Sequence, residues 1–219
     1  MLKNRIFTAL MCIFIILLTI TFSISLPIYI RPIYYAHIEP LNLEESTGKS
    51  ETQIIEAYDE VLDYLTLPNN EFSAGDFTYT DEQKSHFEDC KVLFDLNVVI
   101  LSVSLLGVVI LIILKRKKIY EFNRPFGLHF SFCCGAITFL LFAVIIGLVS
   151  LDFNTAFNVF HKIFFYGKGN WLFLYFKYEI ISIFPIEFFL NCGVIIAVSV
   201  ILLSLALIVF GIIKSKKIK

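Results

Sequence analysis

The sequence predicts an all-α integral membrane protein with four transmembrane helices, both termini in the cytoplasm and a helical, aromatic-rich extracellular cap. Three observations predict this fold. First, 58% of the 219 residues are hydrophobic and only 17% are charged, whereas soluble domains are about 45–50% apolar. Second, four stretches of about 20 residues or more carry no charged side chain, and a helix needs about 20 apolar residues to cross a bilayer. Third, basic residues gather in three short segments. This composition excludes an ordinary cytosolic enzyme, a disordered tail and a disulfide-linked secreted domain.

The apolar stretches place the transmembrane helices at 6–30, 92–114, 128–150 and 190–213. The first stretch follows Lys3 and Arg5 and contains Ser23-Ile24-Ser25, a triplet that resembles a signal-peptide cleavage site. Its apolar run is much longer than the usual 7–15 residues of a signal peptide. We therefore expect it to be retained as an anchor.

Charge sets the orientation of the spans. The segments before the first span, at 115–127 and after the last span hold 11 of the 18 basic residues, with Glu121 as their one acid. Segment 31–91 instead holds 14 acids and four bases. Because cytoplasmic loops carry the excess of Lys and Arg, segment 115–127 is expected to be a cytoplasmic loop, and segments 31–91 and 151–189 are expected to be extracellular.

The sequence of segment 31–91 predicts a helical cap. Ser50-x-x-Gln53 and Thr80-x-x-Gln83 are capping boxes, each of which predicts the start of a helix. The first helix should end at 67–70, where Pro68 stands. The second helix could run unbroken into the span at 92–114. Between them, 72–79 could be extended.

Segment 151–189 is predicted to be an extracellular loop at the membrane interface. Residues 152–189 hold ten Phe, three Tyr and Trp171, and aromatic rings favour the interface. Asn154 is expected to cap a helix that carries Phe157 and His161. Residues 167–170 should form a turn, and 171–184 could dip into the membrane.

Two outward histidines are the candidate site residues. His86 and Asp89 lie three residues apart on one helix face, where a carboxylate can orient the imidazole. A surface histidine beside a surface aspartate is the alternative for this pair. His161 stands among aromatic residues, one turn after Asn158, and a polar ring in that setting needs a partner or a role. His129 is excluded from the site, because it belongs to the inner half of its span.

The sequence indicates no cofactor, no metal site and no nucleic-acid partner. The five cysteines form no CxxC pair, and the histidines have no recognised metal-ligand spacing. The net charge is −1, so the chain as a whole has no basic field for nucleic acid.

Two blocks of residues carry a resemblance to a known family. The first holds Tyr64-Leu65, Phe77 and Glu82-x3-His86-x2-Asp89-x-Lys91-x2-Phe94, and the second holds Phe157-x3-His161-x2-Phe164-Phe165-x5-Trp171, followed by Ile181, Pro185 and Phe188-Phe189. Together with the length and the predicted topology, they resemble the lipoprotein intramolecular transacylase (Lit) family of four-span bacterial membrane proteins. The resemblance covers essentially the whole chain.

This resemblance implies a reaction and a site. Family members move the sn-2 acyl chain of a diacylglyceryl lipoprotein to the α-amine of its N-terminal cysteine, which gives a lyso-form lipoprotein. The family's two catalytic histidines map onto His86 and His161. We expect Asp89, Asn158 and Trp171 to support them. The implied partners are bacterial lipoproteins and membrane lipid, and the implied location is the cell membrane with the site on its outer face.

One departure from the family concerns the stretch after the tryptophan. The family tends to have Pro and Asp at the positions where this chain has Tyr175 and Tyr178. The departure concerns the role of that stretch and not the two histidines.

Two other functions remain open from the residues alone. A non-enzymatic sensor or transporter accessory protein would tolerate the loss of both histidines. A membrane hydrolase would use the same histidines with water as the acyl acceptor, and it would release free fatty acid.

Overall fold

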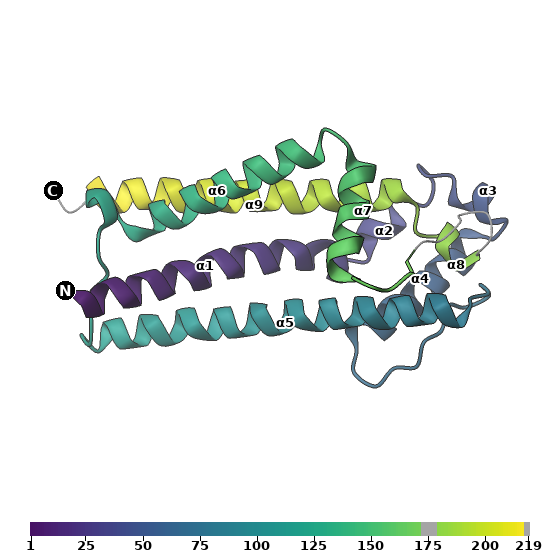
Figure 1. Cartoon of the computed structure of the whole chain (residues 1–219), viewed down its shortest axis with the longest axis horizontal. Coiled ribbons are helices and arrows are strands. Elements are labelled where there is room, and N and C mark those ends of the chain that lie inside the picture. The colour runs from purple at the N-terminus through teal and green to yellow at the C-terminus, as the bar shows by residue number, and fades with distance from the viewer. Residues whose placement is uncertain (172–178, 217–219) are drawn as a thin grey trace. The chain divides into compact units, whose positions relative to one another are not determined.

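The protein is an all-α, multi-pass integral membrane protein. The computed structural model describes residues 1–171 and 179–216, and the regular secondary structure of those residues is entirely helical (Figure 1). Within them, four helices are long and apolar enough to cross a membrane by length and composition. They are α1 (Leu2–Tyr29), α5 (Asp81–Arg116), α6 (Phe130–Val149) and α9 (Ile186–Lys216). The charged first turns of α5, residues 81–91, precede the segment 92–114 that we expect to cross the membrane.

Shorter helices connect the long ones. They are α2 (Pro32–Tyr35), α3 (Leu43–Thr47), α4 (Glu51–Thr66), the 3₁₀ turn η1 (Pro125–Gly127), α7 (Phe153–Phe164) and α8 (Glu179–Ser182). The chain divides into two compact units. The first is built from Met1–Ser25, Asn97–Leu151 and the described part of Ile195–Lys219, and the second from Leu26–Leu96 and Asp152–Val194.

The first unit is a bundle of the apolar parts of the four long helices, which run lengthwise in Figure 1. Small residues let these helices approach closely, because a Cβ on Gly135 would lie only 2.5 Å from the carbonyl oxygen of Ser204. Polar side chains also join the helices. The amide of Asn97 donates to Ser25 Oγ at 2.9 Å, and the hydroxyls of Ser23 and Ser199 are 2.9 Å apart.

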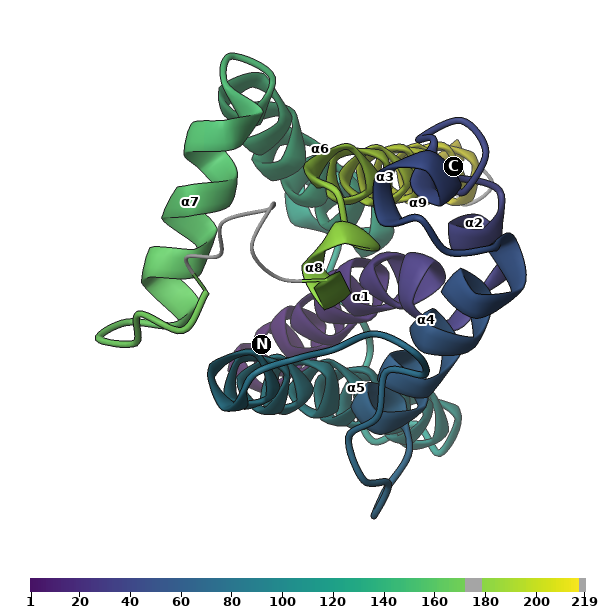
Figure 2. The same ribbon diagram turned by 90° about the vertical axis from the view of Figure 1, so that its right-hand side faces the viewer.

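The second unit has its own aromatic core and contains the candidate site. Tyr34 and Tyr58 stack with ring centroids 3.7 Å apart, and the Tyr34 hydroxyl donates to the carbonyl oxygen of Ile183 at 2.8 Å. Phe188 meets Tyr34 edge-on at 5.2 Å. In Figure 2, α8 lies between α7 on one side and α4 on the other. The core therefore packs segments from the first and last thirds of the chain against each other.

The capping boxes begin the helices that the sequence predicts. Ser50 and Gln53 cap each other at the start of α4, which ends at Thr66. The backbone N–H of Thr80 donates to Gln83 Oε1 at 2.8 Å, and α5 then runs unbroken to Arg116. The prediction for α7 was wrong in its cap.

Asp152, and not Asn154, begins α7. The Asp152 carboxylate accepts a hydrogen bond from the backbone N–H of Thr155 at 3.0 Å, and α7 starts at the next residue, Phe153. Aspartate and asparagine are almost equally good caps, so composition alone could not choose between them. The choice is settled because Asp152 has the extended backbone of a cap, whereas Asn154 lies inside the helix.

Candidate active site

Two histidines from distant parts of the sequence meet in the second unit. His86 lies in the second turn of α5 and His161 in the last turn of α7, and each is only 9% exposed. Their ring centroids are 5.9 Å apart, and the ring planes differ by 25°. The structure thus brings together the two histidines that the sequence singled out, and it buries both.

The hydrogen bond of His161 assigns its tautomer. His161 Nδ1 lies 2.8 Å from the carbonyl oxygen of Phe157, one turn earlier on α7. A carbonyl oxygen can only accept, so Nδ1 carries the proton. In the neutral ring, Nε2 then has the lone pair and is the nitrogen that can take up a proton.

Aromatic side chains surround the histidine pair. Phe165 is 4% exposed, and its ring centroid lies 4.9 Å from that of His86 and 5.5 Å from that of His161. The rings of Phe157 and Trp171 lie 4.2 and 5.1 Å from the His161 ring. These apolar neighbours remove water from the imidazoles and leave them in a weakly polar setting.

Burial makes both histidines harder to protonate. The pKa of His86 is lowered to about 4, mainly by desolvation and also by the nearby His161, while the charge of Asp89 opposes the shift. Desolvation also lowers the pKa of His161, against the opposing effect of its bond to Phe157. Both rings are therefore neutral at pH 7, and each offers one donor and one acceptor nitrogen.

A thiol also contacts the pair. Cys90 Sγ lies 3.5 Å from His86 Nε2, one turn further along α5. Burial raises the pKa of Cys90 to about 12, so the thiol keeps its proton and can donate it to this nitrogen. The sequence analysis missed this contact, although the i, i+4 spacing of His86 and Cys90 would have suggested it.

The predicted supporting residues lie in different settings. Asp89 is one turn after His86, and its carboxylate forms an ion pair with Lys168 and accepts from Asn170 Nδ2 at 3.0 Å. Burial raises the pKa of Asp89, but the bonds from Lys168 and Asn170 outweigh burial and hold it below its ordinary value. Asn158 is exposed on α7.

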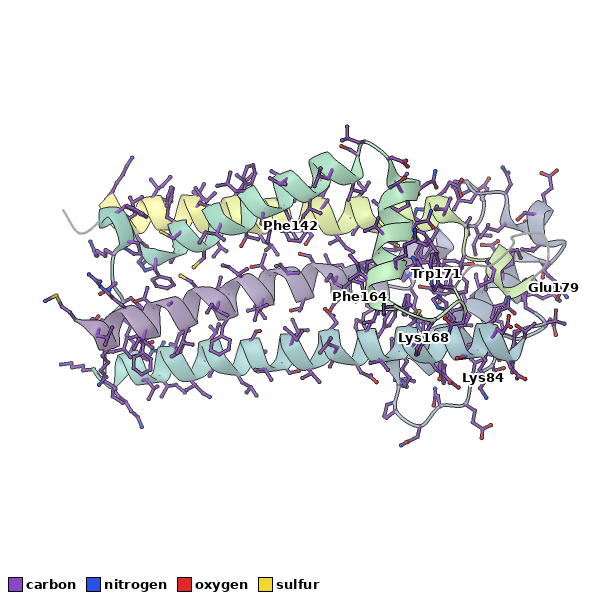
Figure 3. All side chains as sticks on the ribbon, in the orientation of Figure 1. Lys84, Phe142, Phe164, Lys168, Trp171 and Glu179 are labelled. Carbon is purple, nitrogen blue, oxygen red and sulfur yellow. The ribbon has the colours of Figure 1, made fainter. Side chains whose placement is uncertain are left out.

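Trp171 is half-buried and lies against His161. Lys168 and Trp171 are labelled near the end of α7 in Figure 3. A cavity of about 280 Å³ opens there, lined by Lys162, Phe165, Tyr166, Gly167, Lys168 and Trp171.

Tyr175 and Tyr178, where the sequence departs from the family pattern, lie outside the described residues. Lys168 and Asn170 were seen in the sequence only as parts of a turn.

In the part of the chain that the structure describes, no group of three or more His, Cys, Asp or Glu side chains could hold a metal ion. A neutral, buried histidine pair can instead accept a proton at one ring and donate a hydrogen bond from the other. Four helices long and apolar enough to cross a membrane, together with this pair, define a multi-pass membrane protein with a buried histidine pair as its candidate catalytic site.

The sequence comparison narrows this class to a family. Residues 9–189 match the profile of the family described as lipoprotein intramolecular transacylase Lit. The match covers most of the chain, so the chain belongs to the Lit family. Membership identifies it as an acyltransferase of the membrane whose substrates are lipoproteins. A comparison with curated protein sequences gave no match.

Solved structures show the same fold. A structure of the membrane-integral lipoprotein intramolecular transacylase Lit from Bacillus cereus aligns with a TM-score of 0.86 and 20% identity, over 99% of each chain. Two further structures are of the same Bacillus cereus protein with one histidine mutated to arginine or to alanine. They align over 99% of this chain and 94% or 96% of theirs, with TM-scores of 0.80 and 0.79 and identities of 20% and 21%.

Proposed function

We propose that this chain moves the sn-2 acyl chain of a diacylglyceryl lipoprotein to the α-amine of the lipoprotein's N-terminal cysteine, with His86 and His161 as the catalytic pair. The product is a lyso-form lipoprotein. One observation carries the assignment of the pair. Within a chain of the Lit family, His86 and His161 lie with their rings 5.9 Å apart and buried from water.

The reaction needs no acyl-enzyme, because the donor ester and the acceptor amine belong to one substrate molecule. The amine nitrogen attacks the ester carbonyl carbon, a carbon–nitrogen bond forms, and the bond from that carbon to the glyceryl oxygen breaks. Holding the two groups in contact supplies much of the rate enhancement. The protein must then move one proton from the amine to the departing oxygen.

His161 suits the proton transfer. Its Nδ1 proton is held by the Phe157 carbonyl oxygen, so Nε2 is the basic nitrogen. Nε2 takes the proton from the attacking amine and then gives it to the glyceryl oxygen as that oxygen leaves. The lowered pKa of His161 supports this role, because the ring is unprotonated at pH 7.

His86 suits stabilisation of the oxyanion. Its pKa of about 4 keeps it neutral throughout the working pH range, so it acts as a hydrogen-bond donor and not as a base. Donation from the Cys90 thiol to Nε2 would place the His86 proton on Nδ1. A neutral imidazole that donates to a developing oxyanion is an established form of electrostatic catalysis.

The aromatic residues favour transfer over hydrolysis. Water competes with the amine for the same carbonyl carbon, and the rings of Phe165 and Trp171 shield the histidine pair from it. We assign Asp89 to orienting His86, Asn158 to the polar surface of α7, and Trp171 to the level of the lipid headgroups.

The charge pattern supports an active site on the outer face. We place both termini and 115–127 in the cytoplasm, and 31–91 and 151–189 outside, with spans at 6–30, 92–114, 128–150 and 190–213. The site residues then meet lipoproteins anchored in the outer leaflet of a bacterial cell membrane. Membrane lipid surrounds the substrate's acyl chains.

The test uses the purified protein in lipid vesicles and a synthetic diacylglyceryl lipopeptide with an isotope-labelled sn-2 chain. We expect the label on the cysteine nitrogen, and its loss in both His161→Ala and His86→Ala. Full activity in both variants would refute the assignment. Labelled free fatty acid would identify a hydrolase instead, and an unchanged substrate would favour a sensor or transporter accessory protein.

A further inference from the structure

We infer that Asp89, Lys168 and Asn170 form a clasp that holds the segment 165–171 against α5, and that Lys168 is thereby a positioning residue for the histidine pair. The segment 165–171 carries Phe165 and Trp171, whose rings lie beside the histidines. The catalytic consequence of the clasp rests on the proposed function. The existence of the clasp does not.

The contacts of the clasp fall on both sides of His86 in the chain. Lys168 pairs with one carboxylate oxygen of Asp89, and Asn170 Nδ2 donates to the other at 3.0 Å. Asn170 Nδ2 also lies 3.4 Å from the hydroxyl of Ser85. Ser85 and Asp89 are four residues apart and are therefore neighbours on α5. The clasp thus contacts α5 at the turn that carries His86.

Among the described residues, the other hydrogen bonds of the segment lie within it or link it to the end of α7. Helix α7 ends at Phe164, and the following backbone is held by a turn in which the Lys168 N–H donates to the carbonyl oxygen of Phe165 at 3.1 Å. Gly167 adopts a positive φ of 76°, which bends the segment back. Contacts of the Phe165 and Trp171 rings with the histidines are apolar and weakly directional. Charged and polar bonds to Asp89 are directional, and they can set the position of Trp171.

Asp89 has two separable effects. Its charge raises the pKa of His86, and its carboxylate holds Lys168 and Asn170. Lys168 shares only the second effect, because its Nζ bonds Asp89 and its side chain is 53% exposed at the surface. Removing Lys168 therefore tests the clasp while the carboxylate beside His86 stays in place.

The chain supplies its own probe, because Trp171 is its single tryptophan. In purified full-length protein, we expect Lys168→Ala to shift Trp171 emission to longer wavelength and to increase its quenching by acrylamide. Lys168→Arg should keep both values. Lys84→Ala is the matched control, because Lys84 is an exposed lysine on α5 (Figure 3) and its removal should change neither.

Exchange of the two charges separates position from charge. We expect Asp89→Lys alone to disturb Trp171 emission, and the double variant Asp89→Lys with Lys168→Asp to restore it in large part. Transacylase kcat should follow the same order, with a loss of roughly 10- to 100-fold in Lys168→Ala, the scale of a displacement of about 1 Å at a reacting group. Its KM should change less.

The outcomes are distinct. Unchanged Trp171 emission in Lys168→Ala, or an equal change in Lys84→Ala, would overturn the clasp. Failure of the charge exchange to restore the emission would also overturn it. A wild-type protein without transacylase activity would refute the proposed function, while the emission of the variants would still decide the clasp.

Discussion

Acid should destabilise the protein through His86, and the size of the effect follows from its burial. Desolvation lowers the pKa of His86 from 6.5 to about 4 in the folded state. The unfolded chain therefore binds a proton at a pH where the folded protein does not, and the free energy of unfolding falls as the pH drops from about 6.5 to 4. At 1.36 kcal/mol per pKa unit, the loss is about 3 kcal/mol.

The assay compares the wild type with His86→Gln, whose side chain does not titrate. The free energy of unfolding is measured by denaturant titration in detergent micelles at pH 7.5 and at pH 4, with circular dichroism as the signal. Other groups titrate in both proteins, so the difference between the two pH-dependent losses isolates His86. We expect the wild type to lose about 3 kcal/mol more than the variant.

Carboxylates also lose stabilisation in acid. Asp89 and Glu179 have lowered pKa values, so their stabilisation falls as the pH drops below the ordinary carboxylate values, in the wild type and in His86→Gln alike. Equal losses in the wild type and in His86→Gln, within about 0.5 kcal/mol, would refute the description of His86 as a buried neutral ring.

Four further predictions concern catalysis and packing. His161→Gln should lower transacylase activity by roughly 10²- to 10⁴-fold at unchanged protein level in membranes, because the amide cannot act as a base. The acidic limb of the wild-type pH–activity profile should have its midpoint below 6.5, since burial lowers the pKa of His161. Gly135→Leu should destabilise the protein by about 1–3 kcal/mol in denaturant titration, because the new side chain meets the carbonyl of Ser204. Asp152→Ala should lower the free energy of unfolding through loss of the α7 cap, and Asn154→Ala should lower it less in the same titration.

Local patterns were sufficient for most of the fold. Apolar runs predicted the four long helices, because their length and composition are properties of one segment each. Ser50-x-x-Gln53 and Thr80-x-x-Gln83 predicted the starts of α4 and α5, because a capping box closes within four residues. Asn154 failed as a cap because the sequence offered two suitable residues, and the backbone conformation chose Asp152.

The site could be predicted only in part. His86 stood out by its spacing with Asp89 and His161 as a polar exception among aromatic residues, and the family resemblance joined them. Their spacing of 5.9 Å is a property of tertiary packing, which one sequence does not display. The same holds for Lys168, whose partner Asp89 lies on α5 and whose own neighbours indicate only a turn. The hydrogen bond between His161 Nδ1 and the Phe157 carbonyl oxygen, which assigns the tautomer of His161, also could not be predicted from the sequence.

Mass spectrometry of the lipopeptide detects whether the histidine pair moves an acyl chain within one lipoprotein. The chain, His86→Ala and His161→Ala are expressed in a bacterial host that makes only diacylglyceryl lipoproteins, and the N-terminal lipopeptide is fragmented. Total mass does not change when an acyl chain moves, so the fragment ions must locate it. We predict an N-acylated, S-monoacylglyceryl cysteine with the wild type and an unchanged diacylglyceryl cysteine with either variant. An unchanged diacylglyceryl cysteine with folded wild-type protein, or N-acylation that survives in both variants, would contradict acyl transfer by the histidine pair.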